Sequence, residues 1–133
     1  MFRRTILLIA VILSVSAFLT FSCKKSQTSP DLIGKWSGTV LIVGVEFTFT
    51  ADTYTQRTTS FNDIMIGGTK GTISTKGNTI YVHQTDKYYF DNNTNTGAWK
   101  AEETDYTIEY KIAGDQITLK PSTSSDSMVL SRE

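Results

Sequence analysis

The sequence predicts an all-β domain: an antiparallel up-and-down meander of about eight strands that closes into a small β-barrel. Apolar residues recur at every second position in residues 45–51 and 106–112, which is the spacing of half-buried strands. Turn-forming pairs, among them Gly77-Asn78 and Gly114-Asp115, separate such runs at the spacing of a meander. Closure removes the two edges of an open sheet, so a barrel is favoured over the alternative, a β-sandwich.

The expected elements follow in order along the chain. Gly44 separates the first two strands, Ala51-Asp52 the next two, and the two glycine turns separate later pairs. Only Ser60 to Ile66 is predicted to form a single helical turn, with Ser60 or Asn62 as its cap. The strands are expected at residues 35–43, 45–51, 53–59, 69–75, 79–86, 103–112, 115–120 and 126–131.

Residues 1–22 have the order of a signal peptide. Arg3 and Arg4 precede an apolar run from Ile6 to Phe18. This run is shorter than the roughly 18 to 20 residues that span a bilayer as a helix, so an uncleaved membrane anchor is the weaker alternative. Either alternative predicts that the domain is exported.

The residues that follow the apolar run are Leu-Thr-Phe-Ser-Cys, at positions 19–23. They resemble the lipobox of bacterial lipoproteins, matching it at Ser22 and Cys23 and departing from it at Thr20 and Phe21. The resemblance implies that Cys23 is acylated on sulfur by chains such as palmitate and becomes the mature N-terminus. Ordinary signal-peptidase cleavage, which would leave a free thiol, is the alternative.

A lipid on Cys23 would place the protein in the cell envelope as a membrane-anchored lipoprotein. Cys23 is the only cysteine, so the chain cannot form an internal disulfide. Lys24 follows it where an aspartate would resemble an inner-membrane retention signal, which favours the outer membrane in a Gram-negative host. The expected domains are the signal peptide (1–22), the lipidated cysteine with a flexible polar tether (23–31) and the barrel (32–133).

The charge of the chain excludes one class of partner. Basic and acidic residues number 13 each, and the signal peptide holds two arginines and no acid, so the rest of the chain is slightly acidic. A domain without a basic stripe has no electrostatic footprint for nucleic acid.

Residues 32–131 resemble the small lipocalin-like domains of bacterial lipoproteins. Gly34-Lys35-Trp36 looks like the Gly-x-Trp of lipocalins, and the runs from Phe47 to Thr55 and from Gly71 to Ile80 are similar to their hairpins. The resemblance implies a meander barrel in which Trp36 plugs one end. It implies no substrate, since lipocalins differ widely in what they bind.

Aromatic residues on the predicted inner face are candidates for binding a small hydrophobic ligand. An eight-stranded barrel is just wide enough to be filled by side chains or to hold one small molecule, so a filled core is the alternative. The candidate ligand-binding residues are Trp36, Phe47, Phe49, Tyr54, Tyr106 and Tyr110.

The stretch from Asp86 to Glu103 is predicted to be a long polar loop or a hairpin whose strands extend past Tyr88-Tyr89-Phe90 and Trp99. Tyr88, Tyr89 and Trp99 are the candidates for contact with an envelope partner, because loops on a rigid scaffold often carry recognition. The stretch also offers Asp91, Asn93, Asn95 and Glu102 at calcium-loop spacing, but its glycine is displaced by one position, and no metal is predicted.

Catalysis is not expected. His83 is the only histidine and is predicted to be a surface residue of a strand, and no nucleophile is placed beside it by the sequence. No cofactor is predicted. The expected function is that of an envelope lipoprotein with a non-enzymatic lipocalin-like binding domain. The alternative is a structural or inhibitory lipoprotein whose filled barrel acts through its surface.

Overall fold

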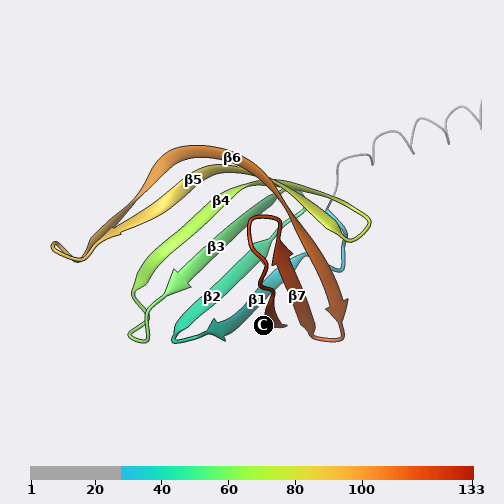
Figure 1. The fold of residues 1–133 in the computed structure, drawn as a ribbon, viewed down its shortest axis with the longest axis horizontal. Coiled ribbons are helices and arrows are strands. Elements are labelled where there is room, and N and C mark those ends of the chain that lie inside the picture. The colour runs from blue at the N-terminus through green and yellow to red at the C-terminus, as the bar shows by residue number, and fades with distance from the viewer. Residues whose placement is uncertain (1–27) are drawn as a thin grey trace, which may run out of the picture.

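The computed structural model describes residues 28–133, and the predicted signal peptide and Cys23 lie outside them. Eight antiparallel strands follow one another in meander order and close into a barrel, which confirms the predicted fold class (Figure 1). The strands are β1 (Gly34–Val40), β2 (Val43–Phe49), β3 (Thr53–Thr59), β4 (Met65–Lys76), β5 (Thr79–Asp91), β6 (Thr96–Ala113), β7 (Gln116–Pro121) and β8 (Met128–Arg132).

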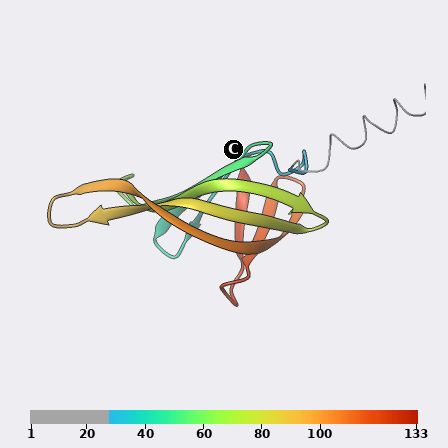
Figure 2. The same cartoon turned by 90° about the horizontal axis from the view of Figure 1, so that it is seen from above.

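The barrel closes where the first and last strands meet. β1 pairs with β8 over Trp36↔Arg132 and Ser37↔Ser131, whereas every other neighbouring pair is a hairpin of consecutive strands. Figure 2 shows the β5–β6 hairpin extending beyond the rest of the barrel. The closing seam is the shortest ladder of the barrel.

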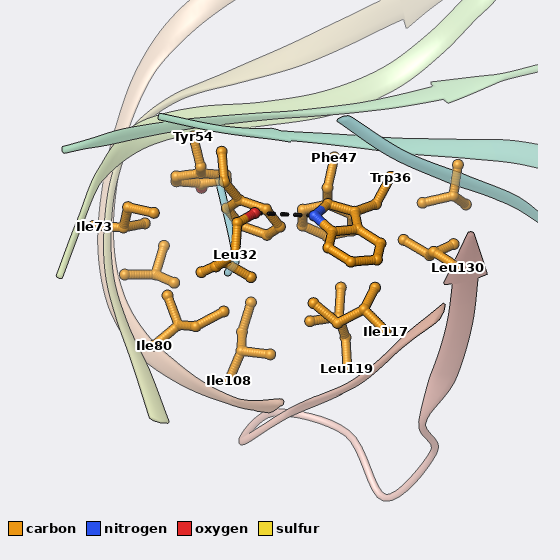
Figure 3. Packing of buried hydrophobic residues seen from close by; sticks show 13 residues of the cluster. Leu32, Trp36, Phe47, Tyr54, Ile73, Ile80, Ile108, Ile117, Leu119 and Leu130 are labelled. Carbon is orange, nitrogen blue, oxygen red and sulfur yellow. Dashed lines mark hydrogen bonds between the residues drawn. The ribbon is translucent and has the colours of Figure 1, made fainter. Parts of the chain in front are cut away.

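The predicted alternation sets the inner face. Val45, Phe47 and Phe49 of β2 are buried, while Glu46 and Thr48 between them are not. The same period places Ile80 and Val82 of β5 inside. The buried apolar residues form one cluster at the centre of the barrel (Figure 3): Leu32, Trp36, Val45, Phe47, Phe49, Tyr54, Ile73, Ile80, Val82, Ile108, Ile117, Leu119 and Leu130.

Three of the four predicted turns are confirmed, at Ala51-Asp52, Gly77-Asn78 and Gly114-Asp115, and one is wrong. Gly77 and Gly114 adopt left-handed backbone angles, with φ of 60° and 61°. Gly44, in contrast, is not a turn residue, because it lies within β2 opposite Thr39. The β1–β2 turn is Leu41-Ile42 instead, with Leu41 at φ 57°.

The helical turn predicted for residues 60–66 does not form, and the described part of the chain contains strands and turns only. The Ser60 amide donates to the Ile64 carbonyl, and Asp63 has φ 61°, so the chain reverses tightly. β4 then begins at Met65 rather than at residue 69, since Thr59 already pairs with Met65.

Of the two alternatives predicted for Asp86 to Glu103, a long polar loop and a hairpin, the structure has the hairpin. β5 continues to Asp91 and β6 begins at Thr96, and these two residues pair. The last pair between β4 and β5 is Gly67↔Tyr89, so the hairpin tip projects beyond the rest of the barrel (Figure 1). The register between β5 and β6 shifts between Gln84 and Asp86, and β5 stays paired with β4 past this shift as far as Tyr89.

Residues 28–31, predicted to belong to a flexible tether, pack against the barrel. Thr28 is buried, and its amide donates to the Ala51 carbonyl at 3.0 Å. The Ser29 amide donates to Thr75 Oγ1 at 2.8 Å. The folded domain therefore begins at least four residues before the predicted boundary at 32. Within the described residues, no helix has the length and apolar character needed to cross a membrane.

The two ends of the barrel differ. The proximal end receives residues 28–33 and carries the β2–β3, β4–β5 and β6–β7 turns. The distal end carries the β1–β2, β3–β4 and β7–β8 turns and the tip of the β5–β6 hairpin.

Candidate functional site

The aromatic residues predicted to bind a ligand are core residues. Trp36, Phe49 and Tyr54 are almost fully buried, and the rings of Phe47 and Phe49 stack with centroids 5.4 Å apart. Tyr106 and Tyr110 are partly buried and pack against the same cluster. Their inward orientation agrees with the prediction, and they pack against one another and the other core residues of the barrel.

Above this cluster, toward the distal end, the inner face becomes polar. Tyr54 Oη donates to Thr69 Oγ1 at 3.1 Å and lies 3.4 Å from Tyr106 Oη. Gln84 is buried and donates through Nε2 to the Glu102 carbonyl at 3.1 Å. Burial raises the pKa of Tyr54 well above its ordinary value, and the Tyr106 hydroxyl adds to the rise. The upper layer of the barrel thus presents hydroxyls and amides rather than an apolar lining.

The proximal end is closed by Trp36. Its indole Nε1 donates to the Leu32 carbonyl at 2.9 Å (Figure 3). The guanidinium of Arg132 lies over the outer side of the ring and donates to the carbonyls of Asp31 and Ile33 at 2.8 and 3.2 Å. The plug that the lipocalin resemblance implied at Trp36 is therefore a packed, hydrogen-bonded end of the barrel.

The residues proposed to contact a partner lie on the β5–β6 hairpin, on two different faces. Tyr88 and Trp99 are cross-strand partners with ring centroids 5.4 Å apart and planes at 68°, and the Lys70 ammonium lies 4.5 Å from the Trp99 ring. A Cβ on Gly97 would collide with the Tyr88 ring, so that ring covers the glycine. Tyr88 and Trp99 consequently stabilise the hairpin itself.

Tyr89 lies on the opposite face, because neighbouring residues of a strand point to opposite sides. Its hydroxyl is 2.9 Å from both carboxylate oxygens of Glu102, and this hydrogen bond raises its pKa. The ammonium groups of Lys87 and Lys100 lie 5.5 and 5.4 Å from its ring. The three proposed partner residues therefore do not form one surface.

The hairpin does not have the arrangement of a calcium loop. Asp91 Oδ1 accepts a hydrogen bond from the Asn93 amide at 2.9 Å, which is a local turn contact. Glu102 lies six positions along β6 from Thr96, roughly 20 Å at 3.3 Å per residue. Among the described residues, no group of three or more His, Cys, Asp and Glu side chains could hold a metal ion.

The three most exposed of the large apolar side chains in the described residues lie at the distal end, and they were not anticipated from the sequence. Leu41, Ile42 and Phe61 are 93%, 78% and 82% exposed. The run Leu41-Ile42-Val43 breaks the period of two, since Val43 opens the inner face of β2, and Phe61 stands between turn-forming residues. An apolar residue inside a turn, with no core position to fill, is the signal that could have identified them.

Next to these side chains the outer wall is hollowed. A depression of about 300 Å³ is lined by residues of β1 to β3 and of the β3–β4 turn, among them Glu46, Arg57 and Asp63. Arg57 Nη1 and Glu46 Oε1 are 4.0 Å apart. Apolar tips beside a charged rim resemble in composition the core and rim of a protein interface.

His83 is exposed, as predicted, and its Nδ1 contacts the Asp105 carboxylate on the neighbouring strand. This hydrogen bond raises the pKa of His83, and the charges of Asp105 and Glu103 add to the rise. On the other side of His83, Thr72 of β4 is its cross-strand partner. His83 and Asp105 line a separate depression of the barrel wall.

Comparison with known proteins gave no relatives: no family model, no curated protein and no solved structure matches this chain.

Proposed function

We propose that the protein is an envelope lipoprotein, anchored through a lipid on Cys23, whose non-enzymatic barrel domain holds a partner protein at its distal end. The observation that carries this proposal is the exposure of Leu41, Ile42 and Phe61 at the tips of neighbouring turns. Gly44 pairs with Thr39 on one side and with Thr59 on the other, and Thr59 also pairs with Met65. The β1–β2 and β3–β4 turns therefore lie side by side, as Figure 1 shows.

Exposed apolar side chains that cluster at one end of a domain favour burial against a partner. Burying an apolar side chain contributes about 1.5 to 3 kcal/mol, so three of them can supply much of the free energy of a stable contact. The charged rim formed by Glu46, Arg57 and Asp63 would then give the contact its orientation.

Geometry and charge favour a protein over a membrane as the occupant. The first described residue, Thr28, lies at the proximal end, where its amide donates to the Ala51 carbonyl, so the segment proposed to carry the anchor joins the domain at the end opposite the distal turns. Neither distal turn carries a lysine or arginine, and the β3–β4 turn carries Asp63. Surfaces that enter anionic membranes are typically rich in basic residues.

The barrel interior gives less support to a small hydrophobic ligand. The aromatic residues that would line its site are packed in the core, and the layer above them is polar. The proposal keeps the partner binding that the sequence analysis expected, and it takes the filled barrel from the alternative function, a lipoprotein that acts through its surface. It places the partner contact at the distal turns and not on the faces of the β5–β6 hairpin.

Site-specific photo-crosslinking tests the proposal. A photoreactive amino acid replaces Phe61 in the full chain, produced in a bacterial envelope, and a second variant carries it at Val129 of β8, an exposed apolar position on the barrel wall. We expect a discrete protein adduct from position 61, none from position 129, and loss of the adduct when Leu41→Ser and Ile42→Ser are added. Equal adducts from both positions, or adducts with lipid only, would contradict the proposal.

The anchor is tested separately by mass spectrometry of the full chain after production in the envelope. We expect loss of residues 1–22 and a mass increase that corresponds to acyl chains on Cys23. The Cys23→Ala variant should keep its signal peptide. A cleaved chain with an unmodified thiol would show ordinary secretion instead and would leave the distal contact open to its own test.

A further inference from the structure

Six polar side chains form a regular grid on the outer wall of the barrel. Ser74, Tyr81 and Thr107 are aligned across β4, β5 and β6, and Thr72, His83 and Asp105 are aligned in the next outward-facing row. Strands lie about 4.8 Å apart and outward residues repeat about every 6.7 Å, so the grid is roughly 10 Å wide and 7 Å long. It lies on the opposite side of the sheet from the core residues Ile73 and Val82.

The wall is hollowed at this grid. A depression of about 490 Å³ is lined by Asp52 of the β2–β3 turn and by Thr72, Ser74, Tyr81, His83 and Asp105, with contributions from their strand neighbours Ile73, Val82 and Tyr106. Its volume lies in the range of roughly 300 to 1,000 Å³ typical of small-molecule sites. It is separate from the depression at the distal turns, with which it shares no residue.

The chemistry of the lining restricts the class of ligand. Tyr81 is 48% exposed and stands in the middle of its row, so its phenol ring is free to contact a ligand. The face of an aromatic ring carries partial negative charge and attracts the weakly positive C–H groups of a saturated ring. Around it stand hydroxyls of Thr72 and Ser74 and planar polar groups of Asp52, His83 and Asp105, which bind ligand hydroxyls as donors and acceptors.

The charges of the lining disfavour the main competing ligand classes, anions and cations. Two carboxylates, Asp52 and Asp105, face the depression against the one imidazole, which disfavours phosphate and other anions. The contact between His83 and Asp105 ties one of these carboxylates to a histidine, which lowers the attraction for a cation. A neutral ring rich in hydroxyls satisfies both the aromatic ring and the polar groups.

We propose that the outer wall of β4, β5 and β6 is a saccharide-binding site, in which a pyranose ring stacks on Tyr81 and hydrogen-bonds to His83, Asp105 and Asp52. The site is independent of the distal protein contact, and it is open along the wall, so a sugar that belongs to a longer chain also fits.

The test uses the full chain, labelled with ¹⁵N and held in micelles of a zwitterionic detergent, because detergents with sugar head groups would compete. The probes are methyl glycosides of glucose, galactose and mannose and N-acetylglucosamine at millimolar concentrations. Amide shifts of residues 72–74, 81–83 and 105–107 should move in a saturable way with at least one probe. Glycerol and inorganic phosphate are the control ligands and should cause no saturable shift there.

Two variants localise the binding. Tyr81→Ala should weaken it at least tenfold, and His83→Ala should weaken it as well. The matched control is Tyr89→Ala, which removes a similarly exposed tyrosine, 41% exposed, from another region of the same strand and should leave sugar binding unchanged. Spectra of each variant establish that the barrel is intact.

The relative affinities for saccharide trimers and single sugars distinguish a polysaccharide ligand from a monosaccharide ligand. Tighter binding of β-1,4-linked trimers of glucose or N-acetylglucosamine than of single rings identifies a polysaccharide as the source, and equal affinity identifies a single sugar. Absence of shifts with every saccharide, shifts that map only to the distal turns or the barrel mouth, or full binding by Tyr81→Ala would overturn the proposal.

Discussion

The guanidinium of Arg132, in the last strand, lies 4.1 Å from the ring centroid of Trp36, in the first. The same guanidinium donates to the carbonyls of Asp31 and Ile33, and the indole donates to that of Leu32. One arginine and one tryptophan therefore tie the entry segment to the strands on both sides of the closing seam.

Removal of either partner should destabilise the barrel by different amounts. Trp36→Ala leaves a cavity in the core and should lower the free energy of unfolding by about 3 to 5 kcal/mol. Arg132→Ala loses a cation–π contact and two hydrogen bonds at an exposed site and should cost about 1 to 3 kcal/mol. Urea denaturation measures both. The control is Arg57→Ala, a surface arginine 4.0 Å from Glu46, which should change stability by less than about 0.5 kcal/mol. Equal losses for Arg57→Ala and Arg132→Ala would contradict this prediction.

The contact between His83 and Asp105 makes stability depend on pH in a defined direction. The pKa of His83 is raised above 6.5 in the folded state, so the contact stabilises the protein fully below pH 6.5 and the contribution is lost as the pH rises through the folded value. Since the chain has one histidine, NMR titration of its ring signals reports His83 alone.

Asp105→Asn should return the titration midpoint of His83 toward 6.5, because it removes the largest cause of the rise. Glu103→Gln, which removes the smallest cause, is the matched control and should move the midpoint only slightly. A midpoint that does not respond to Asp105→Asn would show that the imidazole and the carboxylate are not in contact in solution.

Tyr54 should make the barrel sensitive to alkali. Its pKa is raised by burial, so above pH 10 the unfolded chain loses this proton while the folded chain keeps it, and stability falls as the pH rises toward the folded value. Near neutral pH, Tyr54→Phe should cost about 1 kcal/mol, because Thr69 and Tyr106 lose a hydrogen-bond partner. The difference from the wild type should shrink above pH 10. Thermal unfolding across this range checks it, and parallel curves for the two proteins would refute it.

Gly97 should control the aromatic contact of the hairpin. Gly97→Ala places a methyl group where the Tyr88 ring lies, so the ring must leave Trp99 and the indole N–H signal of Trp99 should shift while that of Trp36 stays in place. Gly77→Ala is the contrasting variant: nothing lies near a Cβ there, but φ is +60°. It should cost about 1 kcal/mol without moving the Trp99 signal. If both variants shifted Trp99 equally, the effect would be general and the proposed contact would be wrong.

The period of two was enough to predict which residues fill the barrel. Val45, Phe47 and Phe49 face inward because their alternation with polar residues leaves one face to bury, and Gly77 and Gly114 mark turns because they adopt positive φ. The turn at Leu41-Ile42 could not be predicted in this way, because it contains none of the residues that usually mark turns, such as glycine, proline, asparagine or aspartate.

The candidate sites depend on register, which periodicity does not contain. His83 and Asp105 are 22 positions apart in the sequence, and only the pairing of β5 with β6, shifted at Gln84, brings them together. The distal cluster of Leu41, Ile42 and Phe61 likewise depends on strand pairing, because the pairing of β1 to β4 brings the β1–β2 turn next to the β3–β4 turn. The hairpin length was underestimated because the polar residues from Asp86 to Glu103 resemble a loop when their cross-strand partners are unknown.

The short seam between β1 and β8 has a consequence for the order of folding. All other ladders join consecutive strands and can form as local hairpins within microseconds, but the seam joins regions as far apart as Ile33 and Arg132, which are 99 positions apart. Closure is therefore expected as the last and slowest step. Until then β1 and β8 expose unpaired edges, so at high concentration β8 of one copy can complete the sheet of another, and exchanged dimers would be the characteristic misfolded product of this chain.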